Sequence, residues 1–256
     1  MAADLSRPAA PVYTKAPMAT GYNWSGFYVG GTLGGAWGTF DPSTSTVFSN
    51  TGYFATTSPP AIATVGAQSF KPSGFTGGVE AGYNWQMGAT VVGVEADFQA
   101  FHLSGSATGT GVYPCCAPTT FTVNSQAQTD WLFTARPRLG FANNNWLFYV
   151  TGGLALTNLK GNFTFTDTFA TAAESGSVSS TKAGWTIGGG VEAGLGGGWS
   201  LKAEYLYVDF GSVSTTSTNL TAFNPAIAFP TNVFTHSTDL KANIARVGLN
   251  YRFGSM

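Results

Sequence analysis

The chain contains few side chains suited to chemistry, and the first candidates are its two histidines and two cysteines. In the run His102-Leu103-Ser104, alternation along a strand would place the imidazole and the hydroxyl on one face. Nucleophilic catalysis by such a pair also needs an acid that orients the base. Glu95 and Asp97 fall on the opposite parity of that strand, so we do not expect an enzyme.

The two cysteines, Cys115 and Cys116, are adjacent in the sequence. Metal ligation usually needs four spaced ligands, and nothing nearby completes such a set. Two alternatives remain, a vicinal disulfide in an exposed loop or two loop thiols without a structural role. The sequence also shows no phosphate-binding loop and no cofactor motif, so we expect neither a metal nor a cofactor.

The charged residues are scarce and follow a strict pattern. They make up 9% of the 256 residues, against about a quarter in ordinary soluble proteins. The net charge of −1 provides no basic surface for nucleic acid. An arginine or lysine that faces lipid at the bilayer midplane costs about 2 to 4 kcal/mol. Within the predicted strands, a set of charged residues lies on the face opposite to the apolar residues. This placement predicts a network of both charge signs inside a lumen. Its members are Glu80, Glu95, Asp97, Arg136, Arg138, Glu192, Lys202, Glu204, Arg246 and Arg252.

Only β-strands would place these charged residues on one face, and the last stretch of the chain shows this alternation most clearly. From Ala245 to Phe253 apolar residues alternate with charged or small ones, and the apolar face ends in two aromatic residues. Such alternation is typical of a membrane strand with its apolar face toward lipid. The pattern predicts eight strands, at about 26–40, 73–85, 90–102, 128–142, 146–159, 182–195, 199–210 and 239–253.

The connections between these strands alternate between long and short. No segment approaches the roughly 18 to 20 apolar residues of a transmembrane helix. An even number of antiparallel strands can close without leaving an edge in lipid. We therefore predict an all-β fold, an eight-stranded antiparallel up-and-down transmembrane β-barrel with short periplasmic turns and four long extracellular loops. Two irregularities are expected: a local bulge or missing bond at Pro137, and inward packing or a bulge at Leu206 and Val208.

We divide the chain into a Pro-rich N-terminal periplasmic extension at 1–22, a barrel domain at 23–253 and a short tail at 254–256. Residues 1–20 contain no apolar core of a signal peptide, and the residues after Met1 look like those around a cleavage point. We expect a signal peptide that is absent or already removed.

Five segments together carry a resemblance to a known family. They read WSGFYVGGTLGGAWG from Trp24, GGVEAGYNWQ from Gly77, YVTGGLAL from Tyr149, GWTIGGGVEAGLGGGWSLKAEYLYVDFG from Gly184 and ARVGLNYRF from Ala245. The chain resembles the outer-membrane β-barrel porin family of alphaproteobacteria, the group of the 25- and 31-kilodalton surface antigens of Brucella and rhizobia. The resemblance covers about 22–253.

The resemblance implies an integral protein of the bacterial outer membrane, surrounded by lipid and lipopolysaccharide. It also implies insertion by the barrel-assembly machinery, which reads a terminal aromatic signal, here Leu249, Tyr251 and Phe253. Gly254 to Met256 follow this signal, where such barrels usually stop. We do not predict an oligomeric state.

For the function we expect a structural and surface-exposed envelope protein, because an eight-stranded barrel is just wide enough for side chains to fill it. The alternative is a narrow porin for small hydrophilic solutes, since many inward positions are glycine, alanine or threonine. A soluble ligand-binding barrel would need charges on its outer face, and the alternation shows the reverse.

Overall fold

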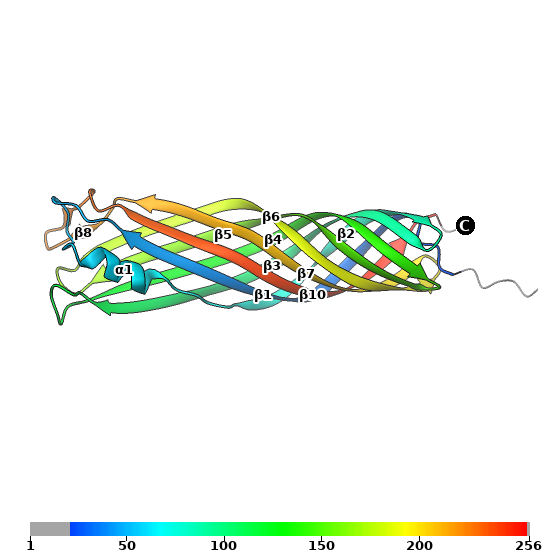
Figure 1. The fold of residues 1–256 in the computed structure, drawn as a ribbon, viewed down its shortest axis with the longest axis horizontal. Helices are drawn as coiled ribbons and strands as arrows, with labels where there is room; N and C mark the ends of the chain where they lie inside the picture. Colours follow the sequence, from blue (N-terminus) through cyan, green and yellow to red (C-terminus); the bar gives the residue numbers. More distant parts are fainter. Residues whose placement is uncertain (1–20, 255–256) are drawn as a thin grey trace, which may run out of the picture.

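Eight long antiparallel strands form a closed ring in the computed structural model, which describes residues 21–254 (Figure 1). They are β1 (Gly26–Thr46), β2 (Ser73–Met87), β3 (Thr90–Val112), β4 (Thr120–Asn143), β5 (Trp146–Asp167), β6 (Ala173–Gly196), β7 (Trp199–Ser217) and β10 (Phe234–Arg252). Each pairs with its sequence neighbours, while β1 pairs with β10 and β10 with β7. The ring therefore leaves no long strand with an unpaired edge in lipid, which confirms the predicted barrel.

The barrel wall shows the expected alternation of faces. Outward side chains such as Leu33 and Val79 are 65% exposed, whereas the neighbouring inward residue Glu80 is 3% exposed. Outward aromatic residues gather near both ends of the lipid-facing band, represented by Trp85 and Trp199 at the short-turn end and by Trp37 and Trp185 at the other. Aromatic side chains favour the two membrane interfaces, so these two groups mark the boundaries of the lipid-facing band.

The three short connections lie where the sequence placed them. They are residues 88–89, 144–145 and 197–198. Gly88, Asn144, Gly197 and Gly198 have positive φ angles of 64°, 54°, 59° and 86°. Tight antiparallel turns need such angles, which glycine and asparagine adopt most readily.

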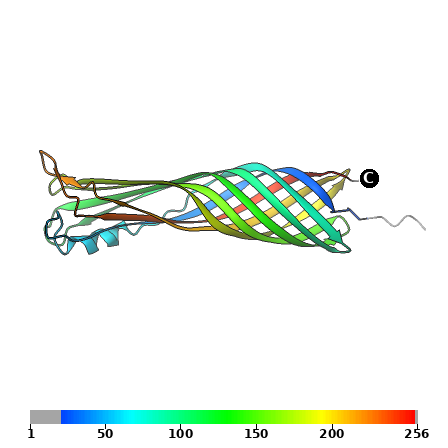
Figure 2. The ribbon, with the colours of Figure 1, turned by 90° about the horizontal axis from the view of Figure 1, so that it is seen from above.

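The outer halves of the strands are longer than predicted. β3 and β4 pair as far as Val112 and Thr120, so the loop expected between 102 and 128 is only 113–119. The connection between β5 and β6 is likewise only 168–172. Beyond the lipid, outward residues such as Ser104 and Thr108 are polar. The sequence therefore shows no alternation of apolar and polar residues there, although the strands remain paired. Figure 2 shows these extensions continuing past the wound part of the barrel.

The first outer connection holds the helix α1 (Ser58–Gly66) beside the barrel wall (Figures 1 and 2). β2 is shorter than its neighbours, and the chain after α1 fills the place above it, with Phe40 and Phe70 exchanging two backbone hydrogen bonds of 3.0 Å. Ile62 of α1 is fully buried.

The last outer connection contains the small hairpin β8 (Thr221–Ala222) and β9 (Ile227–Ala228), which joins β6. No helix in 21–254 is long and apolar enough to cross a membrane.

Both expected irregularities have a physical explanation in the wall. The ladder between β4 and β5 skips Arg136 and Pro137 without a change of register, as expected for a residue that has no N–H to donate. Leu206 and Val208 point inward and are fully buried, while β7 keeps one register with β10 from Trp199 to Asp209 and shifts only beyond that residue. Inward packing, and not a bulge, therefore accounts for the break in parity.

The predicted domain limits at 22 and 253 remain predictions. Nearly all of the N-terminal extension, and the tail residues 255–256, lie outside the described residues. Tyr22 already contacts the periplasmic turns, since its hydroxyl donates to the Gly198 carbonyl at 2.8 Å.

Candidate functional site

The lumen contains a connected layer of buried ion pairs. It joins nine of the ten charged residues singled out in the sequence: Glu80, Glu95, Asp97, Arg136, Arg138, Glu192, Lys202, Glu204 and Arg246. These residues come from β2, β3, β4, β6, β7 and β10, so the layer crosses the barrel interior. Because each pairs with a partner on another strand, the layer ties the wall together from inside.

Arg136 lies at the centre of this charge layer. Its guanidinium contacts Glu95 at 2.6 Å, Asp97 at 3.0 Å and Glu204 at 3.1 Å. Arg246 shares two of these partners, with Glu204 at 2.5 Å and Asp97 at 3.1 Å. Buried charges are tolerated when they are paired, and each of these two guanidinium groups pairs with more than one carboxylate.

Two further cations occupy the same layer. Lys202 contacts Glu80 at 2.5 Å, and Arg138 contacts Glu192 at 2.9 Å. Arg252 points inward as expected but stands apart from the carboxylates. Its guanidinium donates to the Ser25 carbonyl at 3.1 Å and lies 5.2 Å from the Tyr22 ring centroid.

Two tyrosines belong to the layer although the charge pattern did not single them out. Tyr28 donates its hydroxyl hydrogen bond to Glu95 at 2.6 Å, and Tyr149 donates to Glu204 at 2.9 Å. The Arg138 guanidinium lies 4.0 Å from the Tyr149 ring centroid. Both tyrosines occupy the inward parity, so strand alternation was the signal that could have identified them.

The charge layer leaves no path for water. A water-filled channel would give its lining side chains accessible surface, yet the side chains of the nine paired residues are at most 4% exposed. A mixed-charge lumen therefore does not by itself make a pore.

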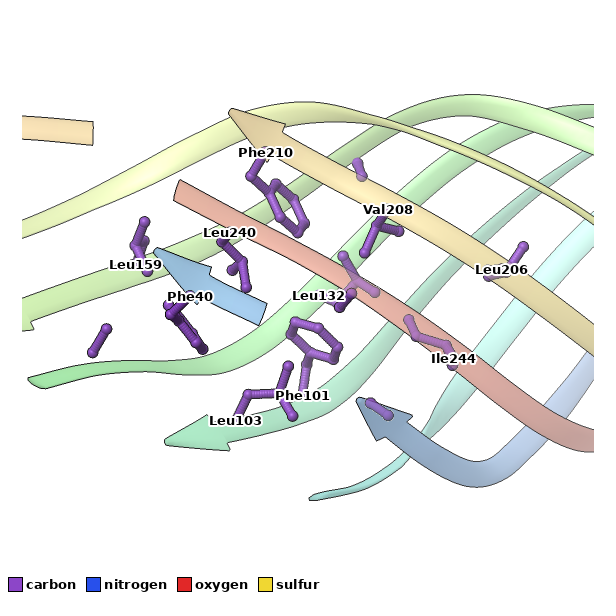
Figure 3. Close-up of a cluster of buried hydrophobic side chains, with 14 of the residues drawn as sticks. Phe40, Phe101, Leu103, Leu132, Leu159, Leu206, Val208, Phe210, Leu240 and Ile244 are labelled. Carbon is purple, nitrogen blue, oxygen red and sulfur yellow. The ribbon is translucent and has the colours of Figure 1, made fainter. Parts of the chain in front are cut away.

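A second, apolar layer closes the lumen above the charges (Figure 3). Phe40, Phe101, Leu132, Leu206 and Leu240 are all fully buried and point into the interior from different strands. The inward Leu206 and Val208 of β7 thus belong to this plug. It would exclude ions even if the charge layer were hydrated, because an apolar constriction stays dry.

The inward glycines mark close contacts between strands and do not widen the lumen. A Cβ atom at Gly78 would lie 2.1 Å from the Phe98 carbonyl oxygen, and one at Gly188 would lie 2.1 Å from the Tyr205 carbonyl oxygen. Glycine lets the backbones approach where a small barrel curves. At these positions the small inward residues therefore leave no space for a pore.

Above the plug a buried polar pair spans the extracellular extension. His236 lies 3.1 Å from Glu174 through Nε2 and 2.9 Å from the Thr44 hydroxyl through Nδ1. Ser217 donates a hydrogen bond to the same Glu174 oxygen. The serine therefore contacts the acid and not the base, and all of these side chains are inaccessible to a substrate or only partly exposed.

The other predicted chemical residues are also separated. His102 is 73% exposed on the outer surface and lies 3.9 Å from Asp130, with no hydrogen bond to Ser104 among the described contacts. Cys115 and Cys116 form a vicinal disulfide, which decides between the two alternatives. Residues 21–254 hold no group of three or more histidine, cysteine or acidic side chains that could bind a metal.

The proposed insertion signal lies on the lipid face at the periplasmic end. Leu249 and Phe253 are 46% and 48% exposed. The Phe253 ring stacks on Phe27 with centroids 5.8 Å apart, next to the strand that closes the barrel.

An apolar, aromatic-bordered outer face around a charged interior defines an integral outer-membrane β-barrel protein. The outer membrane protein beta-barrel domain family matches residues 9–253, and the chain belongs to this family. The 31 kDa outer-membrane immunogenic protein of Brucella melitensis is 34% identical over 99% of this chain and 93% of its own length. The 22 kDa outer membrane protein of Rhizobium leguminosarum is 30% identical over 77% of this chain and 70% of its own.

Among solved structures, Neisserial surface protein A aligns with 90% of this chain and 98% of its own at 14% identity and a TM-score of 0.38. The family match and the Brucella relative, by contrast, confirm the family resemblance and the expected outer-membrane location, which places the barrel wall in lipid and lipopolysaccharide.

Proposed function

We propose that the protein is a closed barrel that anchors a rigid extension at the cell surface, with a structural role in the envelope. The observation that carries this proposal is the filled lumen, in which the charge layer and the apolar plug lie in series. A narrow porin is less well supported, because neither layer gives its residues accessible surface.

We also propose that the protein is not an enzyme. The outward His102 has no hydrogen-bonded nucleophile among the described contacts, and the buried His236 contacts an acid and a threonine instead of a serine. For insertion we propose recognition of Leu249, Tyr251 and Phe253 by the barrel-assembly machinery, supported by their outward position at the end of β10.

Planar-bilayer conductance of the refolded barrel tests the closed lumen. Folding is first established by the heat-dependent shift in gel mobility, and a general porin serves as the positive control. We expect insertion without discrete current steps. Reproducible steps that change in Arg136→Met or Glu192→Gln, but not in the lipid-facing control Val150→Ala, would show that ions cross the lumen and would refute the proposal.

A further inference from the structure

The extracellular tip contains a pocket that the closed barrel does not need. Its cavity of about 240 Å³ lies between the chain preceding α1, the end of β3 and the connection after β5. Tyr53, Phe54, Tyr113 and Phe169 line it together with the Cys115–Cys116 disulfide. Phe54 and Tyr113 are buried, whereas Phe169 is 56% exposed. The pocket is thus an aromatic recess with an exposed ring at its opening.

The aromatic walls stand at angles to one another. Tyr53 and Phe54 are inclined by 77°, Tyr53 and Phe169 by 59°, and Phe54 and Tyr113 by 42°. Two parallel rings would form a slot for a flat ligand. Inclined rings form a box, which suits a compact, rounded group with several faces toward π systems.

The electrostatics of the tip favour a cation. The segments 47–66, 110–121, 166–173 and 217–233 contain no lysine, arginine or histidine, and their one carboxylate is Asp167. Tyr53 and Tyr113 both donate hydrogen bonds to Asp167 Oδ2, at 2.6 and 3.0 Å. Hydrogen bonds to an anion make phenol rings richer in electrons, which strengthens their attraction for a cation within about 6 Å of the ring centroid.

Both phenols also keep their protons. Burial, together with the neighbouring Asp167 carboxylate, raises the pKa of Tyr53 and of Tyr113 well above the ordinary tyrosine range. Asp167 Oδ1 accepts the backbone N–H of Ala172 at 2.8 Å, which fixes the carboxylate in place. The Asp167 carboxylate is therefore held at the hydroxyl ends of both rings, next to the pocket.

We propose that this tip pocket binds a quaternary trimethylammonium group, as in choline or a phosphocholine headgroup. The methyl groups would contact the inclined aromatic rings and the disulfide, while the positive charge faces the rings of Tyr53 and Tyr113, whose hydroxyls donate to Asp167. The site would be part of the surface role proposed above. Its test measures binding and not conductance, so either proposal can fail without the other.

Calorimetric titration of the refolded full chain with choline chloride tests the site, in octyl glucoside, since a phosphocholine detergent would occupy it. The neutral analogue 3,3-dimethyl-1-butanol matches the shape of choline without the charge. We expect saturable choline binding and a Kd for the neutral analogue at least about tenfold weaker, as the loss of cation–π attraction implies. No choline binding, or equal affinity for both compounds, would overturn the proposal.

Variants locate the binding to the pocket. Phe169→Ala removes the exposed ring and is expected to weaken choline binding by about tenfold, and Asp167→Asn, which keeps an acceptor for Ala172, by about fivefold. Phe48→Ala is the matched control, because Phe48 is an exposed aromatic residue that does not line the pocket. Equal affinity in all three variants would contradict the assignment.

Glycerophosphocholine distinguishes the two sources of the group. If it binds at least as tightly as choline, the pocket accepts a lipid headgroup. If it binds much more weakly while choline binds, the pocket takes the free cation, and both results uphold the trimethylammonium proposal.

Discussion

At the scale of single residues, the charged side chains of the interior contact one another instead of water. Arg136 contacts three carboxylates and its side chain has no accessible surface. Removing such a residue leaves its buried carboxylates with one cation fewer, and the resulting excess of buried negative charge costs more free energy than the intact pairs contribute. The charge layer is therefore sensitive to the loss of any one member, although the pairs themselves add little net stability.

Arg136→Met tests this directly. We expect it to reduce the free energy of unfolding by about 3 to 5 kcal/mol, because Glu95, Asp97 and Glu204 lose a shared cation. Urea titration of the refolded barrel, followed by gel mobility, measures the change. Arg252→Met is the control with a much smaller loss expected, since Arg252 contacts a backbone carbonyl and a ring but no carboxylate. Equal losses in the two variants would argue against the network.

Alternation along the strands could identify which residues point inward, but not what each inward residue contacts. From the sequence we therefore predict Arg252 in the charge layer. This prediction is wrong, because Arg252 lies at the end of β10 and contacts Ser25 and Tyr22 instead of a carboxylate of this layer. The aromatic pocket at the tip could not be predicted for a related reason. Its residues come from three outer connections whose spacing in space depends on the length of the strand extensions, and Ser/Thr-rich strands outside lipid do not show the apolar pattern.

At the scale of elements, the single strand β3 runs from the lipid into the water above it. Outward residues of β3 are apolar from Val92 to Ala100 and polar from His102 to Thr110. This apolar part has about the 9 to 11 residues that span a bilayer. The upper half of the β3–β4 hairpin is thus a water-exposed ladder that continues a lipid-exposed one.

A pair of matched substitutions on β3 tests this boundary. Val94→Arg places a cation in lipid and should reduce the free energy of folding into lipid vesicles by about 2 to 4 kcal/mol. Thr108→Arg lies on the same face above the lipid and should change it little. Similar penalties at the two positions, measured by urea titration of vesicle-folded protein, would mean that the boundary is wrongly placed.

Helix α1 gives a second test at this scale. Ile62 is fully buried in an apolar cluster at the tip that includes Phe54, Tyr113 and Phe121, whereas Thr64 on the same helix is exposed. A buried unpaired carboxylate is costly, so Ile62→Asp should detach α1 while the membrane barrel stays folded. Limited proteolysis should then cut the Ile62→Asp variant within 47–72, while its gel mobility stays unchanged. The control variant Thr64→Asp should resist the protease. Resistance of both variants would show that Ile62 does not hold α1 in place.

At the scale of the whole molecule, the barrel is polarised between a short end and an extended end. The three tight turns and the C-terminal end of β10 lie together, and α1 and β8 lie at the opposite end (Figure 1). The disulfide belongs to this second end, because residues 113–119 connect the outer ends of β3 and β4. Bacterial barrels carry short turns on the periplasmic side and long connections outside. The closed lumen and the tip pocket therefore imply that interactions with the surroundings occur at the extended end.

Labelling of single cysteines in intact Gram-negative cells tests this orientation. A membrane-impermeant maleimide should modify Thr108→Cys, because this position is exposed above the lipid on the extended side. Ala89→Cys in a short turn should react only after the outer membrane is permeabilised, and Val94→Cys should stay unreactive in both cases because it faces lipid. The native cysteines form a disulfide and provide an unreactive background. Modification of Ala89→Cys but not of Thr108→Cys in intact cells would reverse the orientation and place the tip pocket in the periplasm, out of reach of any extracellular ligand.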